Sequence, residues 1–205
     1  MDLTFRKAGL EDVDEAVELL AATMADFGVM TMGLGSRELE LKALRHWFVK
    51  KGNRCSHEFC TLALVDGATA GLLLTLRGDR LEQLERTMAN GVLKVYTPFQ
   101  LLRMLWRLMV LGRTDEANSD EYLVSNVAVV PQFRRRGIAT ALLQKAEQEA
   151  NDQGFTKLVL EVETDNSGAI RAYERFGFST VLTTLFKRRE RILGCPGYYK
   201  MLKNI

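Results

Sequence analysis

The sequence is poor in the residues that cross-link a chain or ligate a metal. Its 205 residues include three cysteines, three prolines and two histidines. The cysteines (Cys55, Cys60 and Cys195) are odd in number and lack metal-ligand spacing, so neither a disulfide framework nor a cysteine metal cluster is expected. His46 and His57 also lack a partner at metal-ligand spacing. The sequence therefore predicts no metal site, and its cysteine content fits a reducing compartment.

A strong net charge is missing as well. Lys and Arg number 28 and Asp and Glu 26, which leaves a formal charge of +2. Such a balance provides no global field to hold a polyanion, so we do not expect nucleic-acid binding. The tail Thr184–Ile205 contains six basic residues against one Glu, but it has no nucleic-acid-binding motif. We interpret it as a solvated loop and strand.

Long hydrophobic runs are also absent. The most apolar stretch, Pro98–Gly112, is shorter than the roughly 20 residues that span a bilayer, and Arg103 and Arg107 interrupt it. With Gln100, these arginines form one narrow polar stripe at helical spacing, which favours a mostly buried helix. A substrate lid, a homodimer face and a membrane-surface helix remain alternatives. Without stable membrane insertion or a secretory leader at Met1–Leu10, we expect a cytoplasmic protein.

What is present is the composition of a globular domain, with 47% hydrophobic and 26% charged residues. Periodicity and turn signals, including Asp66-Gly67, predict alternating strands and helices. The predicted strands are Leu3–Lys7, His57–Val65, Ala68–Leu76, Tyr122–Val130, Lys157–Glu163, Phe178–Phe186 and Gly197–Leu202. The predicted helices are Val13–Phe27, a second from the cap Ser36 to Phe48, Arg80–Asn90, Pro98–Gly112, Gly137–Gln153 and Ser167–Phe176, with loops at Gly28–Gly35 and Arg113–Asp120. This order predicts a single α/β (α+β) domain over residues 1–205.

The sharpest local pattern is a strand ending at Pro131, followed by Arg134-Arg135-Arg136-Gly137 at the start of a helix. The first backbone N–H groups of a helix lack intrahelical partners and attract anions. Gly137 allows an anion to approach the backbone, and Thr140 adds a hydroxyl. No Gly-Lys-Ser/Thr follows, so the segment is not a Walker loop and suits a pyrophosphate held without a metal.

A second pattern follows at fixed spacing: Leu160-Glu161-Val162 ends a strand, and Asn166, Ala169, Tyr173 and Gly177-Phe178 come after it. Together with Arg134–Ala139, it resembles the GNAT superfamily of acyl-CoA-dependent N-acyltransferases. The first segment matches that family's Arg/Gln-x-x-Gly-x-Gly/Ala loop, and the second its Asn-x-x-Ala-x-x-x-Tyr-x-x-x-Gly-Phe element. The resemblance covers about Tyr122–Phe178 and implies a mixed central sheet flanked by helices. Residues 80–120 then form a helical insertion before the cofactor-binding strand.

The resemblance implies acetyl-CoA as the cofactor, coenzyme A as the product and a small-molecule or peptide amine as the acceptor. In the family, the strand matching Ser125–Val130 diverges from the one matching Lys157–Glu163, and the pantetheine arm lies in the gap. The implied contacts of the pantetheine arm are Val127, Ala128 and Val129. Those of the pyrophosphate are Arg134, Arg135, Arg136, Gly137, Ile138, Ala139 and Thr140. Asn166 would contact the arm or the pyrophosphate, and Tyr173 would lie near the sulfur. A non-catalytic acyl-CoA sensor of the same fold is the alternative function.

Acyl transfer to an amine requires a base for the attacking nitrogen and an acid for the departing thiolate. Tyr173 is the candidate acid. Glu161, twelve residues before it, is the candidate base, a pairing also seen in the ribosomal-protein N-terminal acetyltransferase branch. Glu121, or water, is the alternative base. The first helix contains many carboxylates, including Glu15 and Glu18, which leads to the hypothesis of a cationic acceptor.

Overall fold

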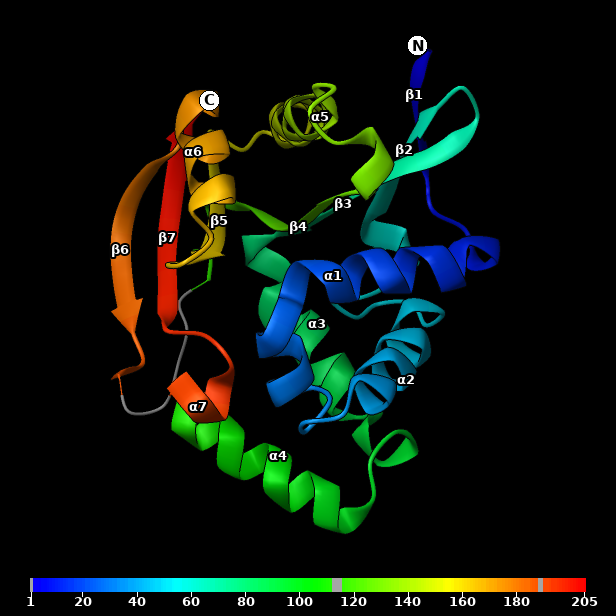
Figure 1. The fold of residues 1–205 in the computed structure, drawn as a ribbon, viewed down its shortest axis with the longest axis vertical. Coiled ribbons are helices and arrows are strands. Elements are labelled where there is room, and N and C mark those ends of the chain that lie inside the picture. The colour runs from blue at the N-terminus through cyan, green and yellow to red at the C-terminus, as the bar shows by residue number, and fades with distance from the viewer. Residues whose placement is uncertain (1, 112–115, 188–189) are drawn as a thin grey trace.

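The computed structural model describes residues 2–111, 116–187 and 190–205. Its centre is a seven-stranded sheet in the order β1-β2-β3-β4-β5-β7-β6 (Figure 1). The strands are β1 Leu3–Lys7, β2 Cys60–Val65, β3 Ala68–Arg77, β4 Tyr122–Val129, β5 Lys157–Glu163, β6 Ser179–Leu185 and β7 Gly197–Asn204. The α-helices are α1 Val13–Thr31, α2 Arg37–Phe48, α3 Leu81–Ala89, α4 Pro98–Leu111, α5 Ile138–Asp152, α6 Ser167–Phe176 and α7 Glu190–Leu193.

Neighbouring strands are antiparallel except for the β4–β5 pair, which is parallel. The predicted hairpin is present between β2 and β3. Asp66 and Gly67 both have positive φ angles, 50° and 84°, as a tight hairpin turn with the twist of the flanking strands requires. The mixed α/β fold predicted from the sequence is confirmed, and the predicted strand positions agree with the observed ones to within a few residues.

Two helical layers cover the sheet. Helices α1 and α2 contribute to the core on one face, where Leu20, Leu44 and Leu72 are buried, and α5 packs on the other (Figure 1). Gly71 of β3 allows α5 to approach closely, because a Cβ at this position would lie 2.6 Å from the Ala128 carbonyl oxygen and 3.1 Å from Leu142 Cδ1. The core therefore positions the start of α5 directly over β3 and β4.

Helix α1 is longer than expected and is kinked at Ala25, whose φ and ψ angles are 42° and −134°. The predicted loop Gly28–Gly35 is wrong in its first half, because the helix continues to Thr31. The added turn packs against α2. A Cβ at Gly28 would lie 2.1 Å from Glu40 Oε1, so only glycine permits this contact. The predicted cap is present, with Ser36 Oγ accepting a hydrogen bond from Leu39 N.

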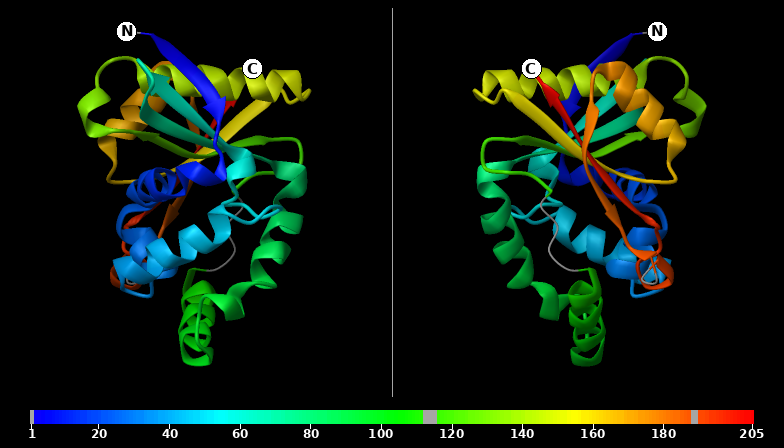
Figure 2. Two further views of the ribbon diagram at one scale, coloured as in Figure 1. Left: turned by 90° about the vertical axis from the view of Figure 1, so that its right-hand side faces the viewer. Right: turned by 90° about the vertical axis from the view of Figure 1, so that its left-hand side faces the viewer.

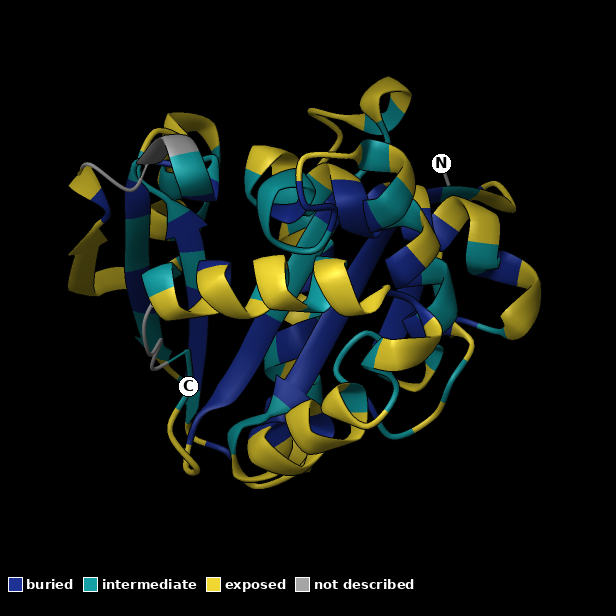
Figure 3. Ribbon diagram, turned by 90° about the horizontal axis from the view of Figure 1, so that it is seen from below, coloured by how far each residue is buried: buried dark blue, intermediate teal, exposed yellow. Residues whose placement is uncertain are grey.

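Residues 81–111, within the predicted insertion, form α3, a short 3-10 turn at Val92–Lys94, and α4, which lies at the end of the molecule remote from both termini (Figure 2). The prediction that the segment from Pro98 forms a mostly buried helix is wrong. Most of α4 is exposed, and Arg107 is its only buried residue (Figure 3). Of the predicted polar stripe, Arg107 faces the protein, while Arg103 is exposed and its Nη2 donates to the Leu34 carbonyl at 3.1 Å.

No α-helix in the described ranges is both long and apolar enough to cross a membrane. The predicted loop Arg113–Asp120 and the basic tail lie partly outside the described residues, which exclude 112–115 and 188–189. The short helix α7 was not predicted, because four residues carry too little periodicity to be recognised in a sequence.

Candidate functional site

Strands β4 and β5 meet only at their beginnings. Their register joins Tyr122 to Leu158 and Leu123 to Val159 and then stops. Further along, β4 stays paired with β3, and Leu73, Leu72 and Gly71 lie opposite the predicted residues Val127, Ala128 and Val129. Within the two described strands, the β5-facing edge of β4 therefore has no strand partner beyond Leu123. Its backbone N–H and C=O groups can pair with an extended ligand.

A bulge in β4 marks the point of divergence. The β3 register passes from Val124 to Asn126 and leaves Ser125 as an extra residue. Asn126 Nδ2 donates to Thr23 Oγ1 of α1 at 2.6 Å, and Ser125 Oγ donates to Asn126 Oδ1 at 3.0 Å. The sequence analysis missed Asn126, because a polar residue within a strand does not reveal a partner 103 positions away. This contact attaches α1 to the opened edge.

The segment after β4 forms an open cationic helix start. A 3-10 turn, Pro131–Phe133, leads into Arg135 at φ 62° and Gly137 at φ 80°, the N-cap of α5. A Cβ at Gly137 would meet no atom within 4 Å, so space is open above the first turn. Arg134, Arg135 and Arg136 are exposed around it.

The same turn exposes backbone donors. The first intrahelical hydrogen bond of α5 runs from Ala141 N to the Gly137 carbonyl, so the N–H groups of Ile138, Ala139 and Thr140 precede the helical ladder. Arg134 Nε donates to the Val129 carbonyl at 3.3 Å, and Arg136 lies 5.7 Å from the Phe133 ring centroid. Free amides, the helix dipole and three arginines together form an anion-binding arrangement.

Helix α6 provides two of the predicted residues. Asn166 is its N-cap, and Asn166 Oδ1 accepts from Ala169 N at 3.1 Å, which leaves its amide nitrogen to donate elsewhere. Tyr173 is half-buried, with its ring centroid 6.0 Å from that of Phe178. Burial raises the pKa of Tyr173 to about 12, and no described residue hydrogen-bonds its hydroxyl. Tyr173 is therefore a protonated donor at neutral pH.

Two carboxylates of β5 lie on the face opposite Leu160 and Val162, because side chains alternate along a strand. Glu161 is paired in register with Lys200 of β7, and Glu163 with Tyr198. Burial, followed by the charges of Asp165 and Asp26, raises the pKa of Glu163 to about 7. Glu163 shares a strand face with Glu161, but the sequence does not reveal that the kinked α1 brings Asp26 close enough to act on its pKa.

Glu121 occupies a different environment. Its side chain is buried and paired with Lys200 Nζ at 3.1 Å, and it accepts from Asn118 N at 2.7 Å and Asn118 Nδ2 at 3.0 Å. Burial alone raises its pKa, but these hydrogen bonds outweigh that effect and hold the pKa below its ordinary value. Glu121 is thus an ionised anchor at the start of β4.

The acidic face of α1 is largely compensated by arginines. Asp12 pairs with Arg6 at 2.7 Å, Asp14 is paired with Arg45, and Glu18 lies 3.6 Å from Arg37. No ion pair is found for Glu15 among the described residues, and a second acidic group, Glu163 with Asp165 and Asp26, lies near the kink of α1.

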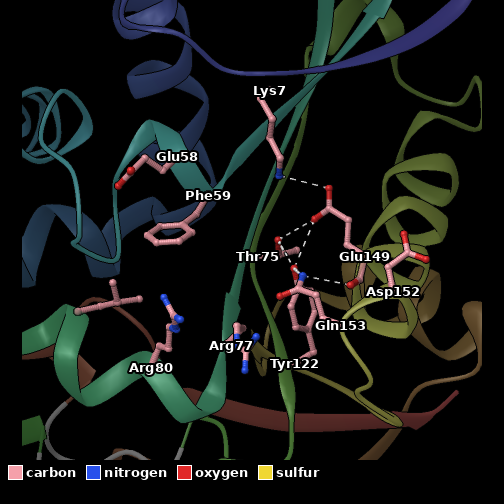
Figure 4. Close-up of a pocket in the computed structure, with 11 residues that line it drawn as sticks. Lys7, Glu58, Phe59, Thr75, Arg77, Arg80, Tyr122, Glu149, Asp152 and Gln153 are labelled. Carbon is pink, nitrogen blue, oxygen red and sulfur yellow. Dashed lines mark hydrogen bonds and ion pairs between the residues drawn. The ribbon is translucent and has the colours of Figure 1, made fainter.

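A separate pocket of about 480 Å³ lies at the other end of α5 (Figure 4). Glu149 is its centre and accepts from Lys7 Nζ at 3.3 Å and Thr75 Oγ1 at 3.1 Å, while Gln153 Nε2 donates to the Tyr122 hydroxyl at 3.1 Å. None of the predicted site residues lines this pocket. Its polar groups satisfy one another, which is typical of a structural network.

Comparison with known proteins settles the family. Residues 35–178 match the model of the Acetyltransferase (GNAT) family, which is well over half of the chain. The chain belongs to the GNAT family. The resemblance drawn from Arg134–Ala139 and Asn166–Phe178 is thereby confirmed, and the matched residues include the β4 edge, the loop before α5 and Tyr173.

Individual GNAT proteins resemble the chain over different lengths. Ribosomal protein bS18-alanine N-acetyltransferase of Escherichia coli K12 is 34% identical over 95 residues, 46% of this chain and 63% of that protein. The match thus spans less than two thirds of that relative. The fold is similar to that of an N-acetyltransferase from Staphylococcus aureus Mu50 (TM-score 0.72, 20% identity, 97% of this chain and 99% of the other). It is also similar to PaiA N-acetyltransferase from Thermoplasma acidophilum in complex with coenzyme A (TM-score 0.56, 14% identity, both chains fully covered).

Proposed function

We propose that the protein is an N-acetyltransferase that transfers the acetyl group of acetyl-CoA to an amine by direct attack in a ternary complex. One observation carries the proposal: the unpaired edge of β4 runs directly into the open, cationic start of α5. An extended arm that ends in a pyrophosphate fits these two features in sequence. The GNAT family match and the enzymatic names of the relatives support the same activity.

Each part of the cofactor has a matching group. The backbone of Val127 and Val129 would pair with the pantetheine amides as an added strand does, with Ala128 between them. The N–H groups of Ile138, Ala139 and Thr140 and the guanidinium groups of Arg134, Arg135 and Arg136 would hold the pyrophosphate around Gly137. Asn166 would use its free amide nitrogen toward the arm or the pyrophosphate.

The reaction forms an N–C bond and breaks the C–S bond of the thioester. The amine must first lose a proton, and the departing thiolate must gain one. Tyr173 is the proposed proton donor, because its hydroxyl is protonated at neutral pH and has no partner among the described residues. A backbone N–H at the β4 edge would stabilise the oxyanion of the tetrahedral intermediate.

The base is proposed among the carboxylates of β5. Glu161 keeps the twelve-residue spacing to Tyr173, whereas Glu163 has a pKa of about 7, close to the value at which a general base works best at neutral pH. Glu121 is a weaker candidate, because Lys200 and Asn118 occupy its carboxylate.

The acceptor is proposed to be a primary amine that arrives as a cation. Asp26, Glu163 and Asp165 lie together where the kink of α1 meets the end of β5, and they would attract a protonated amine before it is deprotonated. The named activity of the bS18-alanine relative makes a peptide N-terminus one acceptor to test.

The test is release of free thiol from acetyl-CoA in the presence of a peptide amine, a polyamine and an aminoglycoside. The proposal predicts amine-dependent turnover with at least one of these classes. Tight binding of acetyl-CoA without turnover on any amine would instead favour an acyl-CoA sensor.

A further inference from the structure

Helix α4 has an unusual orientation for a surface helix. Arg107 is buried against the body of the protein, whereas Arg103 is exposed, and the exposed face includes Phe99, Leu102, Leu105, Trp106, Leu108 and Met109. Leu105 is 56% exposed and Arg107 only 8%. Leu101, Met104, Val110 and Leu111 pack against core clusters on the inner side, so α4 is apolar on both sides, whereas a helix at the surface of a soluble domain normally has a polar outer face.

The inward arginine is poorly satisfied in this position. Arg107 Nη1 is buried and has no hydrogen-bond partner among the described residues. Burial, and then the charge of Arg103, lowers the pKa of Arg107. The six large apolar side chains of the outer face are also unfavourable in water. The observed orientation becomes favourable when the outer face contacts an apolar medium.

The charges on and near α4 favour an anionic surface over a second copy of the chain. Residues 87–111 contain Lys94, Arg103 and Arg107 but neither Asp nor Glu. Lys94 and Arg103 are exposed. A second copy of the chain would place these cations against identical cations. An anionic surface would attract them.

The dimensions of α4 also favour a flat surface over a second copy of the chain. Fourteen residues form a helix about 21 Å long and about 10 Å wide, a footprint of about 200 Å². A stable protein dimer buries about 800 Å² on each partner, so α4 against α4 falls well short. Figures 2 and 3 show α4 lying across one end of the molecule with its exposed side directed away from the body, so a flat surface can contact its whole length.

We propose that α4 docks this protein peripherally on an anionic lipid bilayer. The apolar side chains would enter the boundary between headgroups and acyl chains, with the ring of Trp106 at that level, and Lys94 and Arg103 would remain among the headgroups. This contact needs no membrane-spanning helix and is independent of the acyltransferase site.

The test is co-sedimentation of the full chain with vesicles of phosphatidylcholine containing phosphatidylglycerol, compared with phosphatidylcholine alone. Leu105→Glu is matched by Leu10→Glu, since Leu10 is equally exposed at 55%. Leu10 precedes the start of α1, whereas Phe27, near the other end of α1, packs with Val110 of α4. Leu105→Glu should weaken binding to anionic vesicles roughly tenfold or more, and Leu10→Glu should not. Lys94→Glu should weaken it about fivefold or more.

Fluorescence gives a second readout. The chain has two tryptophans, and Trp47 is 2% exposed in the core, so a blue shift on anionic vesicles reports Trp106. Trp106→Phe should keep binding and lose the shift. Equal binding of Leu105→Glu and the unchanged protein, or equal binding to neutral vesicles, would overturn the proposal. A lipid-free dimer that Leu105→Glu dissociates would also overturn it, because a second copy would then cover α4.

Discussion

The segment Tyr122–Phe178 and helix α4 (Pro98–Leu111) differ in which side chains they expose to water. In the first, apolar side chains such as Leu142 and Leu160 are buried, and the cations Arg134–Arg136 are exposed. In the second, Leu102 and Leu105 are exposed and Arg107 is buried. The contrast shows that local patterns predict well the backbone geometry of a strand end and a helix start. They predict poorly the orientation of a helix whose partner lies outside the chain.

The largest effect is expected from Gly137→Glu, which tests the proposed anion site in the segment Tyr122–Phe178. Strain at φ 80° and a negative charge at the anion site should weaken coenzyme A binding at least about a hundredfold, measured by calorimetry. Gly154→Glu is a matched control, because Gly154 closes the same helix with φ 79° and an equally open Cβ position. Loss of affinity in both variants would indicate general destabilisation rather than a phosphate site.

Two buried cations test the contrast between the regions directly. Lys200→Met removes the partner of buried Glu121 and should cost about 3–5 kcal/mol of unfolding free energy. Arg107→Met removes a cation with an unpartnered Nη1 and should raise the unfolding free energy by about 1–2 kcal/mol. Urea denaturation measures both values. A lower unfolding free energy in Arg107→Met would show that buried Arg107 stabilises the fold, as Lys200 does. The contrast between the two regions would then be wrong.

Tyr173→Phe removes only the hydroxyl proposed to protonate the thiolate. We expect kcat to fall about a hundredfold while the affinity for coenzyme A changes little, because the ring keeps its contact with Phe178. Steady-state kinetics and calorimetry separate the two effects. Normal turnover in Tyr173→Phe would remove Tyr173 from the chemistry.

The pH dependence separates Glu163 from Glu161. If Glu163 is the base, kcat/KM should rise with pH and level off above about 7. In Glu163→Gln this rise should disappear, and kcat/KM at high pH should be about tenfold lower. Glu161→Gln serves as the comparison. Loss of the same rise in Glu161→Gln alone would assign the base to Glu161.

Stability gives an independent check on Glu163. Because the folded state raises its pKa from 4.5 to about 7, the fold favours the protonated carboxyl, and this contribution is present below pH 4.5 and lost as pH rises through 7. Relative to Glu163→Gln, the unchanged protein should therefore lose on the order of 1–2 kcal/mol of unfolding free energy between pH 4.5 and 8. A constant difference across that range would mean that Glu163 is not perturbed.

The sequence predicted the positions of the strands along the chain, the hairpin at Asp66-Gly67 and the helix that starts at Gly137, because each depends on local backbone chemistry. It could not predict features that depend on distant contacts. The pKa of Glu163 is raised by burial and then by the charges of Asp165 and of Asp26 at the kink in α1, and the bulge at Ser125 is attached to α1 through Asn126 and Thr23. The extra turn of α1 depends on Gly28 meeting Glu40 of another helix. The strand positions and the proposed cofactor loop thus depend on local sequence, whereas the proposed acceptor side depends on tertiary contacts.

The central claim is that backbone groups of the β4 edge and the first turn of α5 hold the cofactor. Amide hydrogen exchange with and without coenzyme A tests it most directly. The account predicts slower exchange at Val127–Val129 and Ile138–Thr140 on binding, with little change in α4 or around Glu149. Protection confined to the pocket of Tyr122, Glu149 and Gln153, with unchanged exchange at Ile138–Thr140, would contradict the account.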